Sequence, residues 1–193
     1  MHMPIKIICD LTKKIKNTYE EKDLNRLAKR LGIVVAYRQL GKKPASCKGF
    51  YVVISQIKHI TINSDIPEEE QQIILPHEIG HAILDHSTET IRDYQLFPTR
   101  NYMEIEANIA AAELILDDSE VLERLRYEYT FSEIAKDLAV YPEFLAYKYY
   151  AMESKGFEKL RCPIDIKADF LRFSSQESHV AENDEGADNW WDV

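Results

Sequence analysis

The sequence lacks any apolar run that approaches the roughly 20 residues needed for a membrane-spanning helix. Its first ten residues also lack the long apolar region of a secretory signal. Both absences argue against a membrane-embedded or secreted protein. A chain of 193 residues with 45% hydrophobic and 30% charged residues is instead expected to form one soluble domain with a real core, plus a small appendage.

Cysteine is scarce, and its placement is informative. The three cysteines, Cys9, Cys47 and Cys162, are odd in number, widely spaced and free of any C-x-x-C pattern. This arrangement does not suggest a disulfide framework or a thiolate metal site. We therefore expect reduced thiols and a cytoplasmic protein.

Positive charge is missing from the last twenty residues. Ser174–Val193 has six acidic residues and no Lys or Arg, which leaves 27 acidic against 24 basic residues, a net charge of −3, in the rest of the chain. Phosphate contacts require clustered Lys and Arg, so direct nucleic acid binding is not expected. The tail is expected to be disordered. Its Trp190-Trp191 pair is either a motif that binds a partner or simply part of the flexible terminus.

Residues 77–81, His-Glu-Ile-Gly-His, fit the pattern H-E-x-x-H and are flanked by aliphatic residues. On a helix, residues four apart lie one above the other, so His77 and His81 can bind one metal ion. Glu78 lies at the edge of the same face and can take a proton from a metal-activated water during attack on a carbonyl. The alternative is an amphipathic helix whose two histidines are satisfied by other partners.

A second helical run, residues 101–114, can supply a third ligand. Glu104 and Asn108 share one helix face, so Glu104 is the expected ligand and Asn108 can orient a ligand by hydrogen bonding. Glu106 is the competing choice, but two residues correspond to about 200° on a helix, so only one of the two can face the metal. Asn101-x-x-Glu104 can also be a capping box. Glu106 and Glu113 are expected to face solvent or be held by basic neighbours.

The pattern H-E-I-G-H followed by E-x-E-A-N-x-x-A-A-E-L resembles the ImmA/IrrE family of metallopeptidases, over about residues 18–155. The resemblance implies a gluzincin-like Zn²⁺ site and a prophage or mobile-element regulatory role. It also implies the partner, a helix-turn-helix transcriptional repressor that is cleaved or otherwise inactivated. The expected function is therefore a zinc-dependent endopeptidase, and the alternative is an anti-repressor that binds without cutting.

The expected fold is α+β, with a small antiparallel sheet packed beside the helical zinc site. Residues 1–17 are expected to form a leading helix or arm, and a helix over 18–31 is predicted by the capping box Thr18-x-x-Glu21 and the stop at Gly32. Strands are predicted at 33–38, 50–55 and 58–63, and the metal helix from Asp65 and Pro67 to about Asp85, with Pro76 inside it. Residues 59–63 are the candidate strand for pairing with an extended substrate.

Several further residues around this site have two possible roles. The basic loop 41–49 is either solvated or guides an acidic substrate. Tyr94, Phe97 and Tyr102 either contact substrate or cover the core. His59 is expected on the outer sheet face and His86 is expected to point away from the metal, so neither is counted as a ligand.

Residues 130–154 are predicted to form a helix, a turn and a second helix, which resembles a helix-turn-helix. The sequence predicts three parts: a metallopeptidase domain (1–125), a C-terminal helical module (126–173) and a tail (174–193). The second of these helices, which begins at Pro142, has one Lys and no Arg over 142–150, so packing or partner docking is favoured over DNA reading. Residues 162–173 are expected to form a strand or a docked arm.

Overall fold

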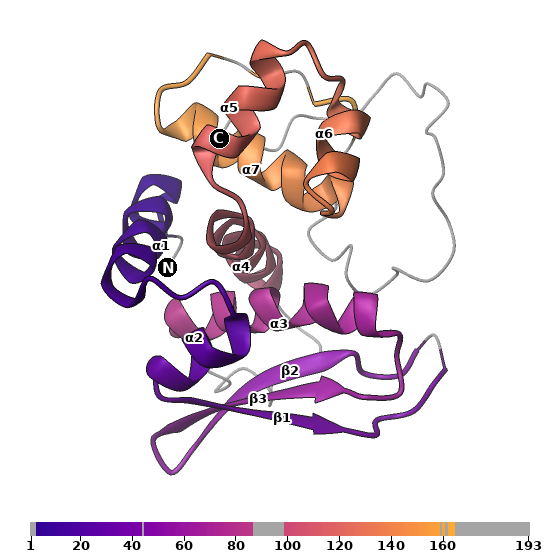
Figure 1. Ribbon diagram of the computed structural model, residues 1–193. Helices are drawn as coiled ribbons and strands as arrows, with labels where there is room; N and C mark the ends of the chain where they lie inside the picture. The colour runs from indigo at the N-terminus through magenta and orange to yellow at the C-terminus, as the bar shows by residue number, and fades with distance from the viewer. Residues whose placement is uncertain (1–2, 44, 87–98, 159, 161, 165–193) are drawn as a thin grey trace.

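The protein combines a small sheet with a set of helices, which confirms the α+β class. The computed structural model describes residues 3–43, 45–86, 99–158, 160 and 162–164. Within these residues the elements are α1 (Ile5–Tyr19), α2 (Leu24–Arg30), β1 (Ile33–Arg38), β2 (Gly49–Ile54), β3 (Ile57–Asn63), α3 (Glu68–Ile83), α4 (Thr99–Ile115), α5 (Asp118–Arg126), α6 (Phe131–Asp137) and α7 (Pro142–Ser154) (Figure 1).

The sheet is mixed, so the prediction of an antiparallel sheet is wrong. Its strand order is β1-β3-β2, with β3 antiparallel to β2 and parallel to β1. The β2–β3 hairpin turns through Ser55 and Gln56, both with positive φ, which matches the twist of paired strands. Because β3 is hydrogen-bonded on both sides, it cannot add a further strand, and the prediction that residues 59–63 pair with substrate is also wrong.

The helices that precede the sheet differ from the prediction. The leading segment is a full helix, α1, which ends at Tyr19 and is followed by Glu20 in the left-handed region. The next helix begins only at Leu24, where the Asp23 carboxylate caps it by accepting the N–H of Arg26 at 2.8 Å. Thr18 therefore lies in the last turn of α1, and the Thr18-x-x-Glu21 capping box predicted from sequence does not start a helix.

The helices α3 and α4 cross at very close range. A Cβ added to Gly80 on α3 would lie 2.5 Å from the carbonyl oxygen of Ala107 on α4. Helix α3 continues through Pro76 and packs on β2 and β3, whereas α4 also packs against α1 and α7 (Figure 1). Since α4 begins at Thr99, Asn101 lies inside the helix and does not cap it.

The last helix, α7, joins two hydrophobic clusters. Phe144 and Tyr147 pack in the core around α3 and α4, while Leu145 and Tyr149 pack with α5 and α6. Lys148 is 1% exposed and pairs with acidic groups of α4 and α5. A helix buried in this way does not present a face to DNA, so the helix-turn-helix character is not confirmed, although both helices lie where the sequence predicted them. The division at residue 125 stays a prediction.

Some expectations lie beyond the part of the chain that the structure describes. The acidic tail, Tyr94 and Phe97 fall outside it, as does most of the segment 162–173, whose described residues, 162–164, form no strand. No helix among the described residues is long and apolar enough to cross a membrane.

The contact between α3 and α4 predicts the effect of Gly80→Ala. The added methyl group would meet backbone, which cannot move aside cheaply, so we expect a loss of about 1–3 kcal/mol in the free energy of unfolding. Urea denaturation followed by circular dichroism measures this loss. Gln72→Ala, at an exposed position of the same helix, is the control and should change stability by less than about 0.5 kcal/mol. Equal stability of the two variants would contradict the close crossing.

Thiol accessibility tests the packing of α1. Cys9 is buried and burial raises the pKa of its thiol to about 11, whereas Cys47 and Cys162 are exposed. A chromogenic disulfide reagent at neutral pH should therefore label Cys47 and Cys162 in the native protein, and Cys9 only after denaturation. Labelling of Cys9 at the rate of the other two would show that α1 is not packed as described.

Candidate metal centre

Two histidines and one carboxylate converge where α3 crosses α4. One ligand atom from each of His77, His81 and Glu104 lies within 4.8 Å of the other two. The two Nε2 atoms are 3.1 Å apart, and the Glu104 oxygens lie 3.4 Å from Nε2 of His77 and 3.8 Å from Nε2 of His81. The structure thus brings together the three residues that the sequence predicted as ligands.

The second nitrogen of each histidine is already held. Asn108 Oδ1 accepts the Nδ1–H of His77 at 2.8 Å, and Nδ1 of His81 lies 3.0 Å from Nδ1 of His86. With each Nδ1 engaged in this way, Nε2 is the ring nitrogen of both histidines that faces Glu104. Two imidazoles and a carboxylate are a common ligand set of catalytic zinc, so the residues present fit this metal.

Charge and burial act in opposite directions on the two histidines and favour an ionised Glu104 between them. Burial, opposed by Glu104, lowers the pKa of His81 to about 4. Burial also disfavours the charged form of His77, but the neighbouring Glu104 and Glu78 carboxylates outweigh it and raise the pKa of that imidazole. Despite its own burial, Glu104 has its pKa held well below the usual range by the two neighbouring histidines.

Glu78 is buried beside the cluster without belonging to it. It is 7% exposed, and a Cβ built at Gly49, the first residue of β2, would lie 3.4 Å from its Oε1. The same Cβ would collide with Ile74, so only glycine lets β2 start this close to α3. Burial, with a smaller contribution from Glu104, raises the pKa of Glu78 to about 7, and His77 opposes this shift. A carboxyl group with a pKa near neutrality can both accept and return a proton.

Two residues beside the site were misjudged from the sequence. His86 turns back onto His81 and does not point away from it, and its Nε2 lies 3.0 Å from Oε2 of Glu106. Glu106 is 3% exposed and faces His86 and the N–H of Met3, so it is neither solvent-facing nor directed at the three-residue cluster. Of the other acidic residues, Glu113 is held by Lys148 and Lys155, in line with the expectation of basic neighbours.

The other candidates lie away from the cluster. His59 is half-buried in β3, between Val34 and Val52 in the sheet register. Tyr102, near the start of α4, is 52% exposed. In the basic loop, Lys48 pairs with Glu70 on α3 at 3.3 Å, and Lys42 and Lys43 are exposed.

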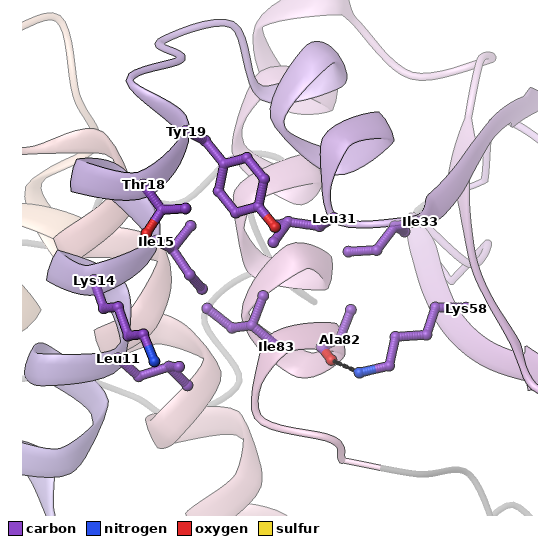
Figure 2. Close-up of a pocket in the computed structure, with 10 residues that line it drawn as sticks. All are labelled: Leu11, Lys14, Ile15, Thr18, Tyr19, Leu31, Ile33, Lys58, Ala82 and Ile83. Carbon is purple, nitrogen blue, oxygen red and sulfur yellow. Dashed lines mark hydrogen bonds between the residues drawn. The ribbon is translucent and has the colours of Figure 1, made fainter.

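A cavity of about 320 Å³ lies between α1, the α2–β1 connection and the end of α3 (Figure 2). Most of its lining is aliphatic, and Lys58 at its edge donates to the carbonyl of Ala82 at 2.6 Å. None of the three clustered residues lines it, so this cavity is separate from the candidate metal centre.

The chain belongs to a known class of peptidase-like proteins. Residues 28–150 match the peptidase family described as the IrrE N-terminal-like domain, and the chain belongs to this family. The chain is also similar to "Uncharacterized immunity region protein 2" of Bacillus phage phi105, with 36% identity over 111 residues that cover 56% of this chain and 69% of the phage protein. The resemblance to the ImmA/IrrE family, of prophage type, is thereby confirmed.

Metal analysis of two variants tests the ligand set. The geometry predicts about one zinc ion per chain in the wild type and in Glu106→Ala at saturating zinc, and loss of zinc in Glu104→Ala, because only Glu104 reaches both Nε2 atoms. Elemental analysis after removal of free metal gives the stoichiometry. Zinc retained by Glu104→Ala but lost from Glu106→Ala would reverse the assignment.

Proposed function

We propose that this protein is a zinc-dependent endopeptidase that cleaves a helix-turn-helix transcriptional repressor. The observation that carries the proposal is the convergence of His77, His81 and Glu104, with the buried Glu78 alongside. Membership of a peptidase family supports it.

The proposed reaction is hydrolysis of a peptide bond by water. Zinc held by His77, His81 and Glu104 would polarise the carbonyl and lower the pKa of the attacking water. Glu78 takes the proton from that water and returns it to the leaving nitrogen, a role that suits a carboxyl pKa of about 7. Asn108 keeps His77 in the tautomer whose Nε2 is available.

Strand β2 is the proposed docking edge for the substrate backbone. With the order β1-β3-β2, one side of β2 has no partner among the described strands, and its first residue, Gly49, lies beside Glu78. An extended peptide added to this edge would pass directly along the candidate centre. Strand β1 is the other edge, and the helix that it packs against is α2, which carries none of the candidate ligands.

The choice of a repressor as substrate rests on the kind of relative. A protein named for a phage immunity region is similar to this chain, and that context fits a repressor as partner. The family resemblance noted from the sequence implies the same partner. A protein substrate also suits a site at a sheet edge, where main-chain hydrogen bonds provide much of the affinity.

Glu78→Gln tests the proposed reaction. The amide keeps the size of the side chain but cannot accept the proton, so we expect cleavage to fall by at least about 10²-fold while zinc content is unchanged. The assay incubates the zinc-loaded protein with a helix-turn-helix repressor from the same genome and follows fragments by mass spectrometry. Glu69→Gln, an exposed residue of the same helix, is the matched control and should cleave normally.

The same assay distinguishes the two functions. Fragments produced by the wild type and not by Glu78→Gln support the peptidase. An intact repressor that has lost DNA binding in a gel-shift assay supports the non-cleaving anti-repressor. A repressor that stays intact and still binds its operator would contradict both.

A further inference from the structure

A chain of hydrogen bonds extends from the candidate ligand His81 into the protein. Nδ1 of His81 lies 3.0 Å from Nδ1 of His86, and Nε2 of His86 lies 3.0 Å from Oε2 of Glu106. The second carboxylate oxygen, Oε1, accepts the backbone N–H of Met3 at 2.6 Å. The path thus connects α3, the turn after it, α4 and the segment before α1.

The direction of the protons in this chain follows by elimination. A histidine that binds metal through Nε2 carries its proton on Nδ1, so His81 must donate to His86. Nδ1 of His86 must then be the acceptor, which leaves its proton on Nε2, facing Glu106. A carboxylate accepts such a proton well, so each polar atom in the path has one role.

The turn that ends α3 places His86 in this path. The N–H of Leu84 bonds to the carbonyl of Gly80, and the N–H of His86 bonds to the carbonyl of His81 at 3.0 Å, while Asp85 has a φ of 55°. The bond from His86 to His81 across a left-handed Asp85 is the 6→1 bond of a Schellman motif, and it reverses the chain directly after the helix. The reversal places the side chain of His86 against His81 on α3, where it is 8% exposed.

The two candidate histidine ligands are supported differently. His77 donates to the neutral amide of Asn108, whereas the path from His81 ends on a buried carboxylate. A carboxylate behind a ligating imidazole fixes the ring and makes its free nitrogen a better donor to metal. Here the carboxylate acts through an intervening imidazole, so both His86 and Glu106 are needed.

We infer that His86 and Glu106 are positioning residues that hold His81 in the orientation and tautomer needed for metal binding. Neither residue is a ligand itself. The inference rests on the proposed metal centre and adds two residues to it.

Zinc affinity is the readout that separates positioning from mere packing. We expect His86→Ala to weaken zinc binding by about 10- to 100-fold, measured by competition with a chromogenic chelator. His86→Asn, whose amide oxygen can replace the acceptor Nδ1 but not the link to Glu106, should lie between His86→Ala and the wild type. Glu106→Gln keeps an acceptor without the charge and should also weaken binding. The visible spectrum of the cobalt-substituted variants should change in the same order.

His59→Ala is the matched control, a histidine replaced at a site remote from the cluster, and should bind zinc as the wild type does. Thermal unfolding of the metal-free proteins shows whether each variant is folded. If His86→Ala does not fold, the zinc affinities of His86→Asn and Glu106→Gln test the inference. Wild-type zinc affinity and an unchanged cobalt spectrum in the folded variants would overturn this inference alone. A wild type that binds no zinc would overturn the metal centre, and this inference with it.

Discussion

The close approach of α3 and α4 is the constraint on which the rest of the structure depends. Helices usually pack with their axes about 8–10 Å apart, and the smallest separations need small residues at the crossing. Gly80 provides such a residue inside the H-E-x-x-H segment, and the Cα of Ala107 would lie only 3.1 Å from a Cβ at that position. At this distance the carboxylate of Glu104 reaches the two histidines one helix away. A wider crossing would leave the same three residues in place but too far apart to share an ion.

The crossing also buries polar groups, which costs free energy unless each has a partner. His77 has Asn108, His81 has His86, and Glu106 has both His86 and the backbone of Met3. Among the described residues, only the hydroxyl of Tyr51 is a buried side-chain group without a hydrogen bond. The polar interior is thus satisfied while both Nε2 atoms still face Glu104. That combination suits a site built for a cation better than a pair of structural histidines.

The sequence predicted the centre better than its surroundings, for physical reasons. Spacing on a helix is regular, so residues 77–81 and the pair Glu104–Asn108 each indicate a metal-binding face from the sequence alone. Chain reversals are less regular. His86 lies five residues after His81 and would point elsewhere on a continuing helix, but the turn at Asp85 brings it back, and Asp85 is not the glycine that usually marks such a turn. Glu106 was expected to face solvent or be held by basic neighbours, and it is this reversal, together with the contact to Met3, that buries it instead.

The sheet was harder to predict for a similar reason. Alternating apolar residues indicated three strands, yet alternation does not specify which strand lies in the middle. The insertion of β3 between β1 and β2 changes which edge is open, and it moves the proposed substrate position from β3 to β2. The two helices within residues 130–154 lie where the sequence predicted them, but the burial of α7 depends on contacts with α4 that are remote in sequence.

X-ray absorption at the zinc edge of the loaded wild-type protein tests whether His77, His81 and Glu104 bind the metal. The scattering from imidazole rings counts the histidines bound to the metal, and sulfur ligands are recognised by their longer bonds of about 2.3 Å. We expect nitrogen and oxygen ligands only, with two imidazoles, those of His77 and His81. A third imidazole would make His86 a ligand, and sulfur or an absence of specific zinc binding would contradict the site itself.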